Sequence, residues 1–139
     1  MSNYNRLFYH FIWTTKNREF LINQEIEKIL CRCIAVKISD LGGICHELGM
    51  TQDHIHLVAT VPPAISLSCF MKNVKGNSTH LINNLFLNQY FGWQEGYGAV
   101  SFNEELLFKI KNYVINQKEH HKNNTLIEKL EATVESNPL

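Results

Sequence analysis

The triplet His54-Ile55-His56 combines residue types and spacing that could bind a metal ion. Residues 54–61 predict a strand, in which successive side chains point to opposite faces of a sheet. His54 and His56 therefore share a face, while Ile55 and Leu57 point to the other, apolar face. Two imidazoles two residues apart can share one metal ion. Taken alone, the triplet is more typical of two exposed sheet histidines that hold no ligand.

Tyr113 and Gln117 form a second pair with chemical potential, on a helix predicted over residues 104–121. They are four residues apart, so both side chains lie on one face of that helix. His120 follows seven residues after Tyr113 and shares the same edge. Taken alone, this pattern is also typical of a tyrosine at the core boundary that extends its hydroxyl to water.

A third candidate is a polar face on the helix that begins at Ser66. Its members combine basic, amide, hydroxyl and imidazole groups: Lys72, Asn73, Lys75, Asn77, Ser78 and His80. Such groups suit contacts with phosphate and sugar. An ordinary solvated helix face is the alternative. Gly76 lies in the middle of the same helix and predicts a kink or a close contact, because glycine costs about 1 kcal/mol relative to alanine there.

Hydrophobic periodicity and capping residues predict the elements that must position these side chains. Strands are expected over 4–15, 44–50, 54–61 and 97–102, and helices over 23–40, from Ser66, and over 104–121, with a short helix after residue 125. The order β-α-β-β-α-β followed by a helix predicts an α+β, ferredoxin-like fold, with an antiparallel sheet and two helices on one face. Right-handed crossovers would bring the first and third strands together at the centre of the sheet.

Length and composition exclude several classes of protein. The 139 residues predict one domain over 1–139, with a core over about 4–121 and a C-terminal tail over 122–139. The first residues lack the features of a signal peptide, and no apolar run is long enough to span a bilayer, so we expect a cytoplasmic protein with no membrane partner. The formal net charge of zero argues against a protein that coats nucleic acid non-specifically. The four cysteines lack the paired spacing of a zinc site.

The signals occur together in a recognisable order. The sequence resembles the single-tyrosine HUH transposases of the insertion sequence 200/605 group and their relatives, the REP-associated tyrosine transposases. The matching stretches are Phe11-Ile12-Trp13-Thr14-Thr15-Lys16, Asp53-His54-Ile55-His56-Leu57 with Pro62-Pro63, Val74-Lys75-Gly76-Asn77-Ser78, Trp93-Gln94-Glu95-Gly96-Tyr97-Gly98-Ala99 and Tyr113-Val114-Ile115-Asn116-Gln117. They cover nearly the whole chain.

The resemblance implies a role for each candidate. His54 and His56 would bind a divalent ion such as Mg²⁺ or Mn²⁺, with Gln117 as the third ligand and His120 as a further candidate. Tyr113 would attack a DNA phosphate, become a 5′-phosphotyrosine and release a 3′-hydroxyl. The ion would help a tyrosine whose free pKa is near 10.

The resemblance also implies the partners. Family members act on single-stranded DNA beside hairpins and are typically homodimers. We expect DNA contacts from Lys16, Arg18, Lys72, Lys75, Asn77 and Ser78. His46 and His121 are outside candidates for the metal or phosphate. One alternative is a domesticated hairpin-binding protein that does not move DNA. Another is a ferredoxin-like metal-binding or small-molecule-binding protein, which would have no need of Tyr113.

Overall fold

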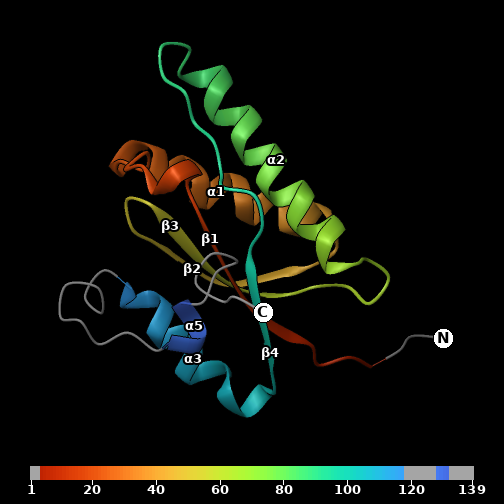
Figure 1. Cartoon of the computed structure of the whole chain (residues 1–139). Coiled ribbons are helices and arrows are strands. Elements are labelled where there is room, and N and C mark those ends of the chain that lie inside the picture. Colours follow the sequence, from red (N-terminus) through yellow and green to blue (C-terminus); the bar gives the residue numbers. More distant parts are fainter. Residues whose placement is uncertain (1–3, 118–127, 132–139) are drawn as a thin grey trace.

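A four-stranded antiparallel sheet lies between two layers of helices in the computed structural model, which describes residues 4–117 and 128–131 (Figure 1). The strands are β1 (Phe8–Thr14), β2 (Ile44–Met50), β3 (His54–Thr60) and β4 (Gly98–Phe102). Their order across the sheet is β2-β3-β1-β4. The expected ferredoxin-like arrangement is therefore confirmed, with the first and third strands at the centre.

The helices divide between the two faces of the sheet. They are α1 (Gln24–Asp40), α2 (Leu67–Leu85), α3 (Leu107–Ile115) and the short α5 (Glu128–Glu131). Figure 1 shows α1 and α2 on one side of the sheet, and α3 and α5 on the other. The two predicted helices on one face and the tyrosine-bearing helix are thus all present.

Local side-chain caps explain where the two long helices begin. The Asn23 side chain accepts a hydrogen bond from the backbone N–H of Ile26, and the Ser66 hydroxyl accepts one from Cys69. Each bond satisfies a backbone donor that the first turn of a helix leaves unpaired. Gly42 follows α1 with a φ of 83°, a conformation that glycine adopts at little cost.

Several predicted boundaries differ from the structure. The strand expected from residue 4 begins at Phe8, where pairing with Phe102 of β4 begins. The last helix opens with a 3₁₀ turn (Glu104–Leu106), and α3 itself ends at Ile115; residues 118–121 of the prediction lie outside the described residues. Helix α2 continues through Gly76, and a Cβ there would have no neighbour within 4 Å, so the expected close contact is not found.

Alternation along the strands gives the sheet two different faces. The face under α1 and α2 carries the larger core, which includes Phe11, Ile34, Leu57 and Phe70. The face under α3 and α5 carries a small apolar cluster of Val58, Ile110, Tyr113, Val114 and Leu130. Within the described ranges, no helix has the length and apolar character needed to cross a membrane.

A candidate metal centre beside a tyrosine

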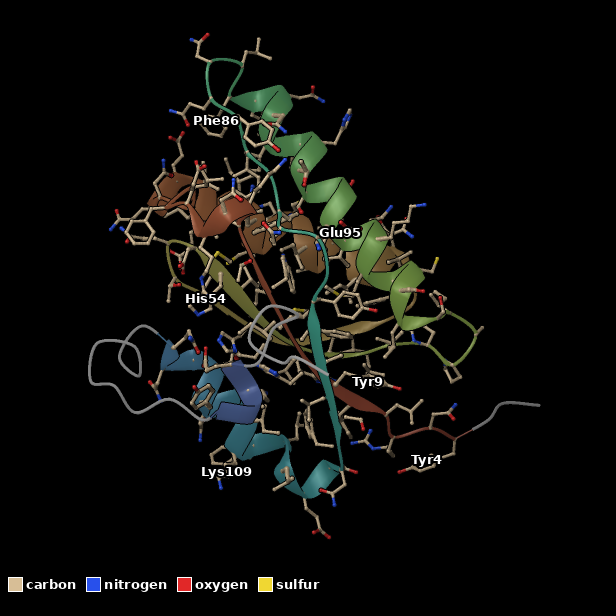
Figure 2. All side chains as sticks on the ribbon, viewed as in Figure 1. Tyr4, Tyr9, His54, Phe86, Glu95 and Lys109 are labelled. Atoms are coloured by element: carbon tan, nitrogen blue, oxygen red, sulfur yellow. The ribbon has the colours of Figure 1, made fainter. Side chains whose placement is uncertain are left out.

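His54 and His56 lie on the face of β3 that α3 and α5 cover. Both side chains are buried, at 2% and 0% exposure. Figure 2 labels His54 at this level of the structure, between the sheet and the C-terminal helices. The predicted alternation is therefore correct, and the alternative of two exposed sheet histidines is excluded for this conformation. A buried imidazole needs polar partners, because an unpaired polar group inside a protein is costly.

The His54 ring is held by a carboxylate and a hydroxyl. Its Nδ1 lies 2.7 Å from Asp53 Oδ1 and 2.8 Å from Thr51 Oγ1. The hydrogen bond from His54 is the main reason why the pKa of Asp53 falls to about 2, so this carboxylate is ionised near neutral pH. A carboxylate only accepts, so the proton of His54 sits on Nδ1 and the lone pair on Nε2. This partner arrangement is typical of metal-binding histidines.

His56 makes contacts through both ring nitrogens. Its Nε2 lies 3.1 Å from Glu131 Oε1, and its Nδ1 lies 2.8 Å from Nε2 of His10. His10 comes from β1, where Ile12 is the direct partner of His56, so the two histidines are diagonal neighbours on one sheet face. Burial is the main reason why the pKa of His10 falls to about 3, which keeps its ring neutral near pH 7.

Glu131 joins the histidine pair to Tyr113. One carboxylate oxygen faces His56, and the other accepts a hydrogen bond from the Tyr113 hydroxyl. Burial raises the pKa of Glu131, but its bonds and charge interactions with His56, Tyr113 and His54 outweigh that effect and lower it to about 2. The carboxylate is therefore anionic at neutral pH. Tyr113 itself is 4% exposed, so the alternative interpretation of a tyrosine that extends its hydroxyl to water does not describe this conformation.

A glycine lets α3 approach the sheet closely enough to bring Tyr113 to the histidines. Gly49 in β2 is paired with His56, and a Cβ added at Gly49 would lie 2.3 Å from the backbone oxygen of Val114. That distance is far inside ordinary contact. The absent side chain at residue 49 thus sets how near the tyrosine-bearing helix comes to β3.

The donor atoms fit one divalent ion. The ligand atoms of His54, His56 and Glu131 all lie within 4.8 Å of one another, and Glu131 Oε1 is 3.7 Å from His54 Nε2. Two ligands at about 2.1 Å from a shared ion are roughly 3 to 3.5 Å apart, so the widest of these separations would have to close by about an ångström around a bound ion. Gln117 adds a further donor: its Nε2 is 3.1 Å from His54 Nε2, and its buried Oε1 has no hydrogen-bond partner among the described residues. An orphaned oxygen beside two imidazoles and a carboxylate suits a cation.

Comparison with known proteins identifies the family of this chain. Residues 3–117 match the family model described as transposase IS200 like. The chain belongs to the IS200-like transposase family. A search of curated proteins finds no match.

Two solved structures share the family fold. A candidate transposase of Deinococcus radiodurans R1 is 25% identical and superposes with a TM-score of 0.69, covering 84% of this chain and 95% of that one. A REP-associated tyrosine transposase bound to a REP hairpin is 18% identical, with a TM-score of 0.66, covering 87% of this chain and 74% of that one. Because the second structure is only 18% identical to this chain, its similarity concerns the fold alone.

The DNA-contact residues expected from the family resemblance fall into two groups. Lys16 and Arg18 are exposed on the 3₁₀ turn Lys16–Arg18 that follows β1. Arg18 Nε lies 3.4 Å from Asp53 Oδ2, so this turn adjoins the carboxylate that holds His54. These two basic residues are therefore near the candidate centre.

The second group lies on α2, which covers the opposite face of the sheet. Lys72 and Asn77 are exposed there. Lys75 is half-buried, and its Nζ donates to the backbone oxygens of Gln94 and Gly96, at 2.8 Å each. Ser78 is fully buried, donates to the backbone oxygen of Lys75 and accepts from Trp93 Nε1. The position of Ser78 therefore contradicts a direct DNA contact in this conformation, because its hydroxyl is engaged inside the protein.

Sequence reasoning missed two members of the site. Glu131 fell in the segment assigned to the tail, and nothing in the sequence distinguishes it there from Glu128 and Glu135. His10 did give one, since it is a polar residue in an otherwise apolar strand, but only the register of β1 against β3 shows that it meets His56. His46 lies apart from the centre, bonded to Thr60 Oγ1 and packed on Phe8. His120 and His121 lie outside the described residues.

Proposed function

We propose that this protein is a DNA strand transferase that cleaves and rejoins single-stranded DNA through Tyr113 and a divalent metal ion. The observation that carries the proposal is the convergence of three buried side chains and one partly buried carboxylate from three separate elements. His54 and His56 come from β3, Tyr113 from α3 and Glu131 from α5, and the Glu131 carboxylate contacts both His56 and Tyr113. A binding module has no need for a tyrosine hydroxyl tied to a metal-ligand set.

The reaction would proceed at the tyrosine oxygen. Tyr113 Oη forms a bond to phosphorus as the bond from phosphorus to the 3′ oxygen breaks, which leaves a 5′-phosphotyrosine and a free 3′-hydroxyl. Glu131, which already accepts the Tyr113 hydroxyl bond, can receive that proton, and the departing 3′ oxygen takes up a proton in turn. A bound Mg²⁺ or Mn²⁺ supplies charge stabilisation for the phosphate and the leaving oxygen. The covalent link conserves the bond energy, so rejoining needs no nucleotide cofactor.

The ion would be held by His54, His56 and Glu131, with Gln117 Oε1 as a fourth donor. The family resemblance assigns the third position to Gln117, whereas we assign it to Glu131, whose ligand atom lies within 4.8 Å of those of both histidines. An ionised carboxylate is also a stronger ligand than an amide for a hard cation. We expect Glu131→Gln to weaken Mn²⁺ binding more than Gln117→Ala, as measured by titration calorimetry. Equal binding by Glu131→Gln and the unmodified protein would return the third position to Gln117.

The DNA partner is proposed to be a single strand marked by a hairpin. One of the matched structures is described as bound to a REP hairpin. Tyr113, His54, His56 and Gln117 are each at most 4% exposed, so the groups that cover them in this conformation must shift before a phosphate can enter. The expected homodimer stays a prediction, which sedimentation of the purified protein would test.

The decisive experiment is a covalent trapping assay. The protein is incubated with a panel of end-labelled hairpin oligonucleotides with single-stranded flanks and Mn²⁺, then run on a denaturing gel. We expect a protein–DNA adduct that disappears with chelator and in Tyr113→Phe. Tyr90→Phe is a matched control, because Tyr90 is exposed and lies on the loop after α2.

Each outcome of the assay has a definite meaning. An adduct that persists in Tyr113→Phe would remove Tyr113 as the nucleophile. Binding of hairpins without any adduct, across a broad panel, would favour the domesticated hairpin-binding protein. Metal binding without DNA binding would favour a ferredoxin-like metal-binding protein.

A further inference from the structure

His10 is a buried polar residue in the middle of the sheet that the proposed chemistry leaves unused. Its side chain is 1% exposed, and its direct partner across the ladder is Val58, which belongs to the small apolar cluster. A phenylalanine ring would fill such a position at lower cost than an imidazole, because burying a polar ring requires compensation. The compensation is the 2.8 Å contact between His10 Nε2 and His56 Nδ1.

The two histidines of the metal set differ in the kind of partner that holds them. His54 Nδ1 faces the carboxylate of Asp53, which only accepts and therefore fixes one tautomer. His56 Nδ1 faces a neutral imidazole nitrogen, which donates or accepts according to its own tautomer. The orientation of the rings, 4.9 Å apart with an interplanar angle of 45°, is suitable for a bond in either direction.

The hydrogen bond between His10 and His56 must be able to run in both directions if His56 is to bind a metal ion. In the arrangement described, His56 Nε2 lies 3.1 Å from the Glu131 carboxylate, so Nε2 carries a proton and Nδ1 accepts from His10. To bind an ion, His56 must present a lone pair at Nε2, so its proton moves to Nδ1, which then needs an acceptor. A carboxylate beside His56 Nδ1 could accept a proton from it when the ion is bound. It could not donate to Nδ1 when the proton of His56 is on Nε2. The imidazole of His10 can do either, because its Nε2 donates in one tautomer and accepts in the other.

We propose that His10 is a positioning residue that holds the His56 ring in both states by reversing the direction of one hydrogen bond. His10 and His56 together carry two ring N–H protons both before and after the ion binds. The metal-free state has them on Nε2 of each ring, and the metal-bound state has them on Nδ1 of each ring. The buried Nδ1 of His10, which has no hydrogen-bond partner in the part of the chain described, is the atom that gains a proton. The inference rests on the proposed metal site and concerns the protein's own protons.

The direct test is nitrogen NMR of the imidazoles in ¹⁵N-labelled full-length protein, with and without saturating Mg²⁺. We expect the metal-free spectrum to show protons on Nε2 of both His10 and His56, and Mg²⁺ to move both to Nδ1 while His54 keeps its Nδ1 proton. Unchanged tautomers at His10 and His56 when Mg²⁺ perturbs His54 would overturn the proposal. No perturbation of His54 would instead count against the metal site itself.

Variants at residue 10 separate positioning from packing. His10→Phe keeps an aromatic ring but removes the bond, so we expect Mn²⁺ binding to weaken about ten- to a hundredfold, the usual effect of losing such a partner. In His10→Gln the side-chain amide can donate or accept, and we expect it to restore most of the affinity. His46→Gln is the matched control, because His46 is bonded to Thr60 instead and should leave affinity unchanged.

The results also remain informative when one variant fails. Equal Mn²⁺ affinity in His10→Phe, His10→Gln and the unmodified protein would show that His10 only fills space. If His10→Phe does not fold, the NMR of the unmodified protein and the affinity of His10→Gln decide the matter. If the unmodified protein binds no metal ion, the metal-free tautomers still test the bond: a proton absent from His10 Nε2 would overturn it.

Discussion

The two faces of the sheet differ in what their buried residues do. Under α1 and α2, the strands contribute apolar side chains to one continuous core. Under α3 and α5, the same strands contribute His10, His54 and His56 beside a cluster of five buried apolar residues. Strand β3 serves both, because Ile55 and Leu57 alternate with the histidines. The face under α1 and α2 mainly stabilises the fold. The face under α3 and α5 buries polar groups, which need hydrogen-bond partners.

The difference teaches that a deep site can be built into a small domain when the opposite face is fully apolar. Buried imidazoles, an amide and a carboxylate contribute little net stability, because hydrogen bonds in the protein replace bonds to water. The larger core must therefore carry most of the free energy of unfolding. This division predicts opposite mutational profiles for the two faces.

The largest expected effects on stability and on adduct formation come from two separate substitutions, one on each face of the sheet. Leu57→Ala leaves a cavity in the larger core and should lower the free energy of unfolding by about 3 kcal/mol, with adduct formation per folded molecule retained. Tyr113→Phe removes one hydroxyl and should cost only about 1 kcal/mol while abolishing the adduct. Urea unfolding and the trapping assay measure both. A larger stability loss in Tyr113→Phe than in Leu57→Ala would refute the division.

Metal binding should stabilise the protein through the second face alone. At a Mn²⁺ concentration a hundred times its dissociation constant, the free energy of unfolding should rise by about 2.7 kcal/mol, because the ion binds the folded state. Thermal unfolding with and without Mn²⁺ measures the shift. Leu57→Ala should keep it and His54→Ala should lose it. The same shift in His54→Ala would mean that the ion binds elsewhere.

Two glycines give a matched pair for the docking of α3. Gly49→Ala brings a methyl group against the backbone of Val114, so it should cost about 1 to 3 kcal/mol and reduce adduct formation by displacing Tyr113. Gly76→Ala adds a methyl group in open space on α2 and should stabilise the protein by about 1 kcal/mol without affecting the adduct. Full activity in Gly49→Ala would show that the approach of α3 to β2 does not matter.

The smallest effects are expected on α2, whose outer surface could contact DNA. Lys72→Ala should weaken hairpin binding modestly and reduce the salt dependence by about one counterion, with stability unchanged. Lys75→Ala should instead lower stability, because its Nζ donates to two backbone oxygens that would lose this partner. Binding isotherms at several salt concentrations, with urea unfolding, distinguish the two. A stability loss in Lys72→Ala with unchanged hairpin binding would mean that Lys72 stabilises the fold and does not contact DNA.

Local features of the sequence determined most of the fold. Asn23 and Ser66 cap helices through bonds to residues three positions away, and alternation along 54–60 places the histidines on one face. These relations depend on neighbours along the chain, so the sequence contains them directly. The candidates His54, His56, Tyr113 and Gln117 could be named for the same reason, together with the family resemblance.

The tertiary structure alone decided which partners those candidates meet. Glu131 reaches His56 across 75 positions, and His10 reaches it across 46 positions, through a strand register that no local pattern specifies. The interior role of Ser78 likewise follows from its meeting with Trp93. Spacing along one element fixes which side chains share a face, whereas contacts between elements depend on how the whole chain packs. The candidates His54, His56, Tyr113 and Gln117 could thus be read from the sequence, whereas Glu131, His10 and their hydrogen bonds to His56 could not.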